Sequence, residues 1–405
     1  MKRQLVLITA LFFSILLQGC YSQGTSAPAP LNVNVVEGDS SATVTWDMVP
    51  GVEYWIFRAA ASDLTPSSCF GALQCQIVTN AISPTVISGL TNGTVYSFTI
   101  NGRIAGGKGG PGSPSIQKTP RLAGVTWNTG AAQGVDDLHG ITYGTVYVAV
   151  GNNGASFSSI DGINWTAFTS PLPAANFTAV TYWGGKYVAV GLGGAIYTST
   201  DALLWQQQTS NTSNDLYAIS SNGVSVLVVT GANGTILTST DGINWTSQAS
   251  GTSNNLYGVA YANGKFIAVG GAGTILTSSD TVTWQAITPT SSANLRTITY
   301  GTIAGATIGT TTPLFVALGD AGTLVTSSDA VTWTGQISIA ANPQINSVTF
   351  GHQFVAVANN GGIFTSTDGN NWVLSTTATA PLYAISHAAY DYTAVGGSGL
   401  NMHSK

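Results

Sequence analysis

Charged side chains are scarce in this chain, because Asp, Glu, Lys and Arg make up only 7% of its 405 residues. Lys and Arg together number 11, and the formal net charge is -5. A protein that follows a phosphate backbone needs many clustered cations, so we expect no nucleic-acid partner. The chain is nevertheless 44% hydrophobic and carries 49 glycines. This composition favours a folded all-β protein over a disordered chain.

Cysteine is also rare, with three in the chain. Cys69 and Cys75 form a close pair, and an even number of cysteines in an exported protein typically forms disulfides. We therefore expect a structural Cys69–Cys75 disulfide. A metal site at this pair would need histidines nearby, but the first histidine in the chain is His139. We expect neither a metal site nor a cofactor.

A basic and then hydrophobic stretch opens the chain. Lys2 and Arg3 precede apolar residues 5–17, a run shorter than the roughly 20 residues that a helix needs to cross a bilayer. This pattern predicts a secretion signal over residues 1–19. The small, polar and proline-containing residues that follow predict a flexible tether over residues 20–27.

Residues 17–20, with the sequence LQGC, resemble the lipobox of bacterial lipoproteins. The resemblance implies cleavage before Cys20 and a lipid on its thiol, which anchors a protein by burying acyl chains in a membrane. Tyr21 in place of an aspartate is similar to lipoproteins sorted to the outer membrane of Gram-negative cells. We therefore expect an exported protein, lipid-anchored in the cell envelope at the outer membrane. The alternative is an ordinary cleaved signal with an incidental cysteine.

Residues 28–120 alternate between strand patterns and turn residues, with strands expected at residues 42–46, 54–58 and 95–100. The segment resembles a fibronectin type III domain. Trp46 stands where that family has its core tryptophan, residues 90–96 (LTNGTVY) resemble its tyrosine corner, and residues 110–115 (GPGSPS) precede the last strand. The resemblance implies a β-sandwich that serves as a spacer or adhesion module.

The rest of the chain, residues 121–405, is repetitive. Six tryptophans recur at intervals of 40, 40, 39, 49 and 39 residues, namely Trp165, Trp205, Trp245, Trp284, Trp333 and Trp372. Each repeat also contains three upstream strand patterns, and four strands in about 40 residues are typical of a β-propeller blade. The longest repeat has its extra residues near 302–313, where we expect an insertion loop.

The last repeat stops before its tryptophan strand. Residues 123–127 (AGVTW) match the missing strand and lie ahead of the first complete repeat. Pairing them with the end of the chain would close the ring and leave no free sheet edge. The sequence therefore predicts a fibronectin type III-like sandwich followed by a seven-bladed β-propeller with N-to-C strand closure.

An aspartate precedes each repeat tryptophan by four residues. Residues 239–245 (STDGINW) and 366–372 (STDGNNW) resemble the Asp-box or BNR repeats of sialidases and photosystem assembly factors, with one residue fewer between aspartate and tryptophan. An aspartate at a turn accepts hydrogen bonds from its own backbone. One carboxylate per repeat is too few for calcium. We therefore assign a structural role to Asp161, Asp201, Asp241, Asp280, Asp329 and Asp368.

The residues for a known hydrolase mechanism are missing. A sialidase grips its substrate with several arginines, but Arg296 is the single arginine after Trp127. Other glycosidases need two facing carboxylates, and this region has no glutamate and no evident aspartate pair. The arginine-bearing surface of the photosystem factors is absent as well. We expect that the chain is not an enzyme, with a polysaccharide-acting hydrolase of sialidase-like fold as the alternative.

One position varies between repeats while its neighbours stay constant. It lies at the start of each first strand and should surround the mouth of the central channel, where it could recognise a peptide or a sugar. Packing between blades is the alternative. The residues are His139, Thr178, Tyr217, Tyr257, Arg296, Asn346 and Tyr383. The sequence thus predicts a membrane-anchored binding or assembly-scaffold protein whose propeller binds an envelope protein or a glycan.

Overall fold

The structure is a computed structural model that describes residues 24–69, 75–168, 175–304, 311–335, 338–388 and 391–404. The predicted signal, residues 1–19, and the predicted lipid-attachment residue Cys20 lie outside the described residues. No helix among those described is long and apolar enough to span a membrane. The chain divides into two compact units, with the boundary between Arg121 and Leu122. We call them unit 1 and unit 2.

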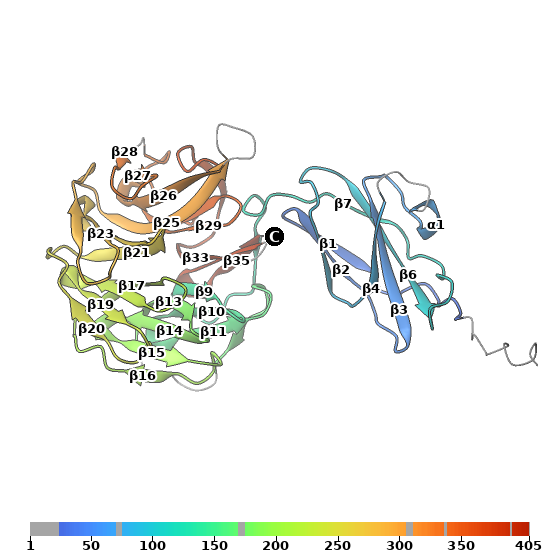
Figure 1. Ribbon diagram of the computed structural model, residues 1–405, viewed down its shortest axis with the longest axis horizontal. Helices are drawn as coiled ribbons and strands as arrows, with labels where there is room; N and C mark the ends of the chain where they lie inside the picture. The colour runs from blue at the N-terminus through green and yellow to red at the C-terminus, as the bar shows by residue number, and fades with distance from the viewer. Residues whose placement is uncertain are drawn as a thin grey trace, which may run out of the picture. The chain divides into compact units, whose positions relative to one another are not determined.

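Unit 1 contains two antiparallel sheets and one short helix (Figure 1). Its elements are β1 (Asn34–Gly38), β2 (Ser41–Thr45), β3 (Val52–Ala59), α1 (Pro66–Cys69), β4 (Gln76–Ala81), β5 (Thr85–Ser88), β6 (Tyr96–Ile104) and β7 (Ile116–Lys118). The strand orders are β1-β2-β5 and β4-β3-β6-β7. Residues from both sheets share one buried core, in which Trp46 packs against Tyr54 with ring centroids 5.5 Å apart.

Two local features of unit 1 concern the sequence predictions. The disulfide between Cys69 and Cys75 is present, with Cα atoms 5.4 Å apart. The described end of the predicted flexible tether, residues 24–27, makes contacts with β6. The backbone N–H of Ile104 donates to the carbonyl of Thr25 at 2.8 Å, and Ala27 is buried. These residues lie against β6 because their backbone groups pair with it.

Unit 2 consists of four-stranded antiparallel sheets, seven of them among the described residues. The first, inner strands are β9 (Leu138–Tyr143), β13 (Phe177–Trp183), β17 (Leu216–Ser221), β21 (Leu256–Ala262), β25 (Leu295–Ala304), β29 (Ile345–Phe350) and β33 (Leu382–Ala388). Each inner strand contacts the next one, and β33 contacts β9. The inner strands therefore form a closed circle around the middle of the unit (Figure 1).

The remaining strands lie progressively further out. The second strands are β10 (Tyr147–Gly151), β14 (Lys186–Gly191), β18 (Leu227–Gly231), β22 (Lys265–Gly270), β26 (Thr311–Gly319), β30 (Phe354–Ala358) and β34 (Asp391–Gly396). The third are β11 (Ser156–Ser159), β15 (Ile196–Ser199), β19 (Ile236–Ser239), β23 (Ile275–Ser278), β27 (Leu324–Ser327), β31 (Gly362–Ser366) and β35 (Asn401–Ser404). The outer strands are β12 (Thr166–Ala167), β16 (Gln206–Gln208), β20 (Thr246–Gln248), β24 (Gln285–Ile287), β28 (Thr334–Gly335), β32 (Val373–Thr377) and β8 (Asn128–Thr129).

Short 3-10 turns join the second and third strands of six sheets among the described residues. They are η1 (Asn152–Gly154), η2 (Leu192–Gly194), η3 (Ala232–Gly234), η4 (Gly271–Gly273), η5 (Asp320–Gly322) and η6 (Gly397–Gly399). The second strands are buried almost completely, since branched aliphatic side chains cover both of their faces. This alternation of buried strands and glycine-rich turns is consistent with a β-propeller.

The last sheet contains strands from both ends of unit 2. Its order is β33-β34-β35-β8, with Met402 opposite Thr129 and His403 opposite Asn128. The paired strand thus follows Trp127, whereas the sequence placed it over residues 123–127. Those residues form the turn instead, because the N–H of Gly124 donates to the Ser404 hydroxyl at 2.8 Å.

The longest repeat also differs from its prediction. An insertion loop was expected over residues 302–313, but β25 and β26 continue their pairing as far as Ala304 and Thr311. Much of the extra sequence therefore lengthens these two strands. The β-branched threonines and isoleucine in this stretch suit an extended hairpin.

Candidate binding site on the inner strands

A β-bulge interrupts every inner strand at its second residue. In β17, Leu216 lies opposite Gly231 and Ala218 lies opposite Thr230, so Tyr217 has no partner in β18. A bulge leaves one residue unpaired and redirects its side chain. The seven bulged residues are those that the sequence singled out: His139, Thr178, Tyr217, Tyr257, Arg296, Asn346 and Tyr383. We call them the mouth residues.

The local sequence around the bulges is similar from sheet to sheet. A fully buried aliphatic or aromatic residue precedes each mouth residue, as Leu216 precedes Tyr217, and fixes the start of the strand. The residue opposite this anchor is glycine in six sheets. A Cβ on Gly231 would lie 2.2 Å from the carbonyl oxygen of Asp215, and one on Gly396 would lie 2.0 Å from that of Pro381. Only glycine allows the two backbones to approach this closely.

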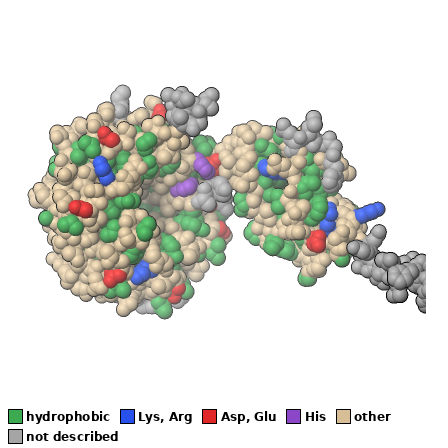
Figure 2. All heavy atoms as spheres, viewed as in Figure 1, with side chains coloured by type: hydrophobic (Ala, Val, Ile, Leu, Met, Phe, Trp, Pro, Cys, Tyr) green, Lys and Arg blue, Asp and Glu red, His purple; other side chains and the backbone are tan. Residues whose placement is uncertain are grey.

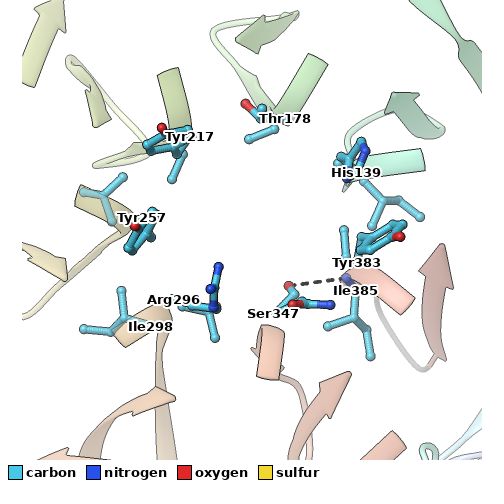
Figure 3. Close-up of a pocket in the computed structure, with 18 of the residues that line it drawn as sticks. His139, Thr178, Tyr217, Tyr257, Arg296, Ile298, Ser347, Tyr383 and Ile385 are labelled. Carbon is cyan, nitrogen blue, oxygen red and sulfur yellow. Dashed lines mark hydrogen bonds between the residues drawn. The ribbon is translucent and has the colours of Figure 1, made fainter. Parts of the chain in front are cut away.

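The mouth residues surround one cavity of about 410 Å³ (Figure 3). We call it the mouth cavity. All seven side chains are half-buried. Aliphatic residues two positions further along the strands line it too and are more buried, among them Ile141, Val259 and Ile385. Figure 2 shows one face of unit 2, which is hollowed near its middle and has two neighbouring histidines beside the hollow. Because His352 and His387, with ring centroids 6.2 Å apart, lie at the far ends of the inner strands from the mouth residues, this is the face opposite the mouth cavity.

Aromatic rings form two groups on the cavity wall. The rings of Tyr217 and Tyr257 are 5.4 Å apart, and the guanidinium carbon of Arg296 lies 5.4 Å from the Tyr257 ring centre. Separately, the rings of His139 and Tyr383 lie with their centroids 4.6 Å apart and their planes inclined by 33°. Ring faces of this kind hold apolar or cationic groups of a ligand.

Arg296 is paired within the protein. It forms a salt bridge with Asp320 through Nε and a longer hydrogen bond from Nη2 to Oδ2 at 3.4 Å. Asn294 donates to the same carboxylate at 2.8 Å. Asp320 therefore neutralises the cation of the mouth cavity.

Two mouth residues bind the neighbouring sheet. The Thr178 hydroxyl donates to the carbonyl of Leu216 at 2.6 Å, and the Asn346 amide donates to that of Leu382 at 2.8 Å. Both acceptors are the buried anchors of the next inner strand. For Thr178 and Asn346, the alternative role of packing against the neighbouring sheet therefore has direct support.

Burial shifts the pKa of three mouth residues. Burial lowers the pKa of His139, and this effect outweighs the nearby Asp137 and Asn152, which raise it. The imidazole is therefore neutral at pH 7. Burial, followed by the neighbouring carboxylate of Asp215, raises the pKa of Tyr217. Burial and Asp137 do the same for Tyr383, so both tyrosines keep their hydroxyl protons.

The six Asp-box aspartates act within their own turns. In the best-formed example Asp241 Oδ1 accepts hydrogen bonds from the backbone N–H groups of Ile243 and Asn244, both at 2.8 Å, and from the Ser239 hydroxyl at 3.0 Å. Asp161, Asp201, Asp280, Asp329 and Asp368 accept the equivalent bonds. Within the described part of the chain, no three His, Cys, Asp or Glu side chains form a group that could hold a metal.

One set of residues near the cavity was not singled out from the sequence. At five of the seven positions, the side chain two residues before a mouth residue accepts a hydrogen bond from the 3-10 turn of the previous sheet. Asp215 Oδ1 accepts from the N–H of Gly193 at 2.8 Å, and Asp137 Oδ1 accepts from that of Ser398 at 2.9 Å. The recurrence of Asp or Asn at this position was the available signal.

Comparison with known proteins identifies the fold of unit 2. No protein-family model matches the sequence, and no curated protein matches it. Among solved structures, YCF48 from Cyanidioschyzon merolae is 16% identical, with a TM-score of 0.54 over 69% of this chain and 98% of its own. YCF48 bound to D1 peptide is 15% identical, with a TM-score of 0.56 over 69% of this chain and 94% of its own. Virginiamycin B lyase from Staphylococcus aureus is 12% identical, with a TM-score of 0.57 over 69% of this chain and 100% of its own. At these identities the likeness shows a shared β-propeller fold.

The lyases correct one expectation from the sequence. The lack of an arginine cluster and of a carboxylate pair led us to expect that the chain is not an enzyme. Streptogramin B lyases are enzymes and share this fold at 11–12% identity. The absence of sialidase-like groups therefore does not exclude catalysis on this propeller, because the fold supports other chemistry.

Proposed function

We propose that the propeller binds a segment of a protein partner in the mouth cavity, and that the chain serves as a binding or assembly-scaffold protein. The observation that carries the proposal is the set of seven bulges, which turns three tyrosines, a histidine and an arginine toward one cavity. The binding of a D1 peptide by YCF48, a propeller of the same fold, supports a protein ligand. A glycan, also expected from the sequence, has no comparable support.

We also propose the finer architecture that the sequence suggested. Each four-stranded sheet of unit 2 corresponds to one blade, which gives a seven-bladed propeller closed by β8 and β35. Unit 1 corresponds to a fibronectin type III-like spacer. The shared core of its two sheets, and the hydrogen bond from the N–H of Thr91 to the Tyr96 hydroxyl at 3.2 Å, support this assignment.

The anchoring proposal rests on the sequence alone. We propose that the protein is exported and carries a lipid on Cys20 that holds it at the outer membrane. Replacing Cys20→Ser should abolish incorporation of a labelled fatty acid and shift the protein from the membrane fraction to the soluble fraction. Labelling that persists in the variant would contradict the anchor.

Binding at the mouth cavity is tested by removing its aromatic surface. The full chain with Tyr217→Ala and Tyr257→Ala should lose a partner that the wild-type protein retains from an envelope extract. Tyr143→Ala, which removes an exposed tyrosine at the other end of β9, is the control and should retain it. If both variants melt as the wild type and retain the same proteins, the mouth cavity is not the binding site.

A lyase activity is the second candidate, and His139 favours it. One solved lyase is a catalytically inactive variant, with one histidine replaced by alanine, bound to quinupristin. A neutral, half-buried histidine in a cavity can accept a proton from a substrate. The test is to incubate the protein with quinupristin and to follow conversion by chromatography, with His139→Ala as control. No conversion above the control would remove this candidate.

A further inference from the structure

The segments around the mouth cavity carry charge of one sign. We call these segments the rim, which comprises the turns η1–η6 and residues 130–137, 175–176, 209–215, 249–255, 288–294, 338–344 and 378–381. Among these described residues, the charged side chains are Asp136, Asp137, Asp215 and Asp320. Lys and Arg do not occur among them.

The single mouth cation does not balance this charge. Arg296 is paired with Asp320, so three carboxylates remain uncompensated. Asp137 and Asp215 each use Oδ1 for the N–H of a 3-10 turn. These bonds hold the two carboxylates in place two residues before the mouth residues His139 and Tyr217. Their surroundings favour cationic groups on an incoming ligand.

The wall of the cavity has a different chemistry from its rim. Behind the mouth residues it is lined by buried aliphatic side chains, including Val180, Ile298 and Ile385. Tyr217 and Tyr383 also line the cavity; along the chain Tyr217 follows the rim residue Asp215 by two positions, and Tyr383 precedes the lining residue Ile385 by two. A ligand that fits has an apolar part inside and positive charge outside.

We propose that the mouth cavity takes an extended peptide segment in which an apolar side chain enters the cavity and flanking Lys or Arg side chains meet the rim carboxylates. The proposal rests on the proposed function and names the chemistry of its partner. Asp137 precedes β9 and Asp215 precedes β17, and β13 lies between these two inner strands. One cation would not reach both carboxylates, whereas an extended segment carries several.

Synthetic peptides of equal length test the charge and the apolar anchor separately. The probes are a fluorescein-labelled peptide with leucine flanked by lysines, one with leucine flanked by glutamates, and one with serine flanked by lysines. Fluorescence anisotropy with the full chain should show binding of the first probe alone, weakening as salt screens the rim. Binding of the glutamate probe, or equal binding of the serine probe, would overturn the proposal.

Rim variants give effects of opposite sign. Asp137→Asn and Asp215→Asn should each weaken the leucine–lysine probe about twofold to fivefold, the range for exposed ion pairs. Asparagine keeps the acceptor oxygen, and Asn255 already serves in this position in another sheet. Arg296→Gln frees Asp320 and should strengthen binding. Asp47→Asn, in unit 1, removes equal charge elsewhere and should change nothing.

The two proposals fail separately. If the Asp137 and Asp215 variants bind the probe as the wild type does, the basic-segment proposal is wrong, while the loss of a partner through Tyr217→Ala and Tyr257→Ala would still support a protein site. If none of the probes binds, the basic-segment proposal is also wrong. Thermal melting of each variant identifies any effect that comes from unfolding.

Discussion

Two groups of polar residues in unit 2 can be told apart in the sequence: the Asp-box aspartates, which recur unchanged at a fixed spacing, and the mouth residues, which differ from repeat to repeat. The Asp-box aspartates recur at a fixed distance from tryptophan because each one binds its own turn, so their role could be predicted from the sequence. The mouth residues vary because the bulge places them beside an open cavity. The pairing of Arg296 with Asp320 could not be predicted, since the two lie 24 residues apart and meet only through the bulge in β25 and the turn η5.

The Asp-box turns should make stability depend on acid. Backbone N–H groups lower the pKa of Asp329 from 3.8 to about 2. For Asp161, burial would raise the pKa, but hydrogen bonds outweigh it and also bring it to about 2. A carboxyl group whose pKa is lower in the folded state stabilises the fold above its unfolded pKa and loses this effect as pH falls toward the folded value. The urea midpoint should therefore fall between pH 4 and pH 2.

One turn variant checks the origin of this acid effect. Asp241→Ala removes the acceptor for two backbone N–H groups and should cost about 1 kcal/mol at pH 7. At pH 2 the gap to the wild type should narrow, because pH 2 lies well below the unfolded pKa of 3.8 and much of the stabilisation from the lowered folded pKa of Asp241 is then lost. Asp136→Ala, outside the Asp-box turns, is the control. An unchanged gap at both pH values would show that the carboxylate charge is not what stabilises the turn.

At the scale of the strand, the bulge links the fold to the site. Sequence patterns predict that a strand begins at the buried anchor, but a pattern of period two does not show where pairing slips by one residue. In six sheets a close backbone contact between a glycine of the second strand and the residue before the anchor accompanies the slip, which also occurs in the seventh sheet. One sheet has Ala358 in place of the glycine, and there a turn through Asn359 replaces the 3-10 helix. Among the described sheets, the 3-10 turn therefore occurs only where the second strand ends in glycine.

Two adjacent glycines allow a matched test of this contact. A Cβ at Gly270 would lie 2.1 Å from the carbonyl oxygen of Asn255, whereas one at Gly271 would have its nearest neighbour at 3.6 Å. Gly270→Ala should cost about 1–3 kcal/mol by forcing the backbones apart, and it should displace the bulged Tyr257. Gly271→Ala should be nearly neutral. Thermal melting compares the two, and equal stability would show that this close backbone contact does not require glycine.

For the whole molecule, the repeat determines most of what could be predicted. The last repeat lacks its tryptophan strand, and Trp127 lies ahead of the first complete repeat. The sequence therefore predicted that the two ends of unit 2 meet, and β8 pairs with β35 as expected. The exact pairing was misplaced because Trp127 ends a turn and does not lie in a strand. In complete repeats the outer strand likewise follows the tryptophan, as β16 follows Trp205. The acidic rim needed the structure, since its members are far apart in the chain.

The closing sheet reproduces an Asp-box turn from two separate segments. Gly124 N–H donates to the Ser404 hydroxyl as Gly242 N–H donates to that of Ser239, and Trp127 Nε1 donates to the Gly124 carbonyl at 2.8 Å. Ala123 occupies the place of the aspartate and is buried. The closure therefore depends on Trp127 and on backbone pairing, without the carboxylate that supports the other turns.

This difference makes Trp127 the residue on which the closure should depend most. Trp127→Ala should destabilise the protein by about 2–3 kcal/mol, since the half-buried ring packs in the cluster that holds Met402. Hydrogen exchange should rise at Asn401–Ser404, because these residues then lose their edge partner. Trp284→Ala removes an equivalent half-buried ring from a continuous sheet, in a cluster that holds no residue of the closing sheet, and should leave exchange at Asn401–Ser404 unchanged. Equal protection of β35 in both variants would show that the ring stays closed without the tryptophan that precedes β8.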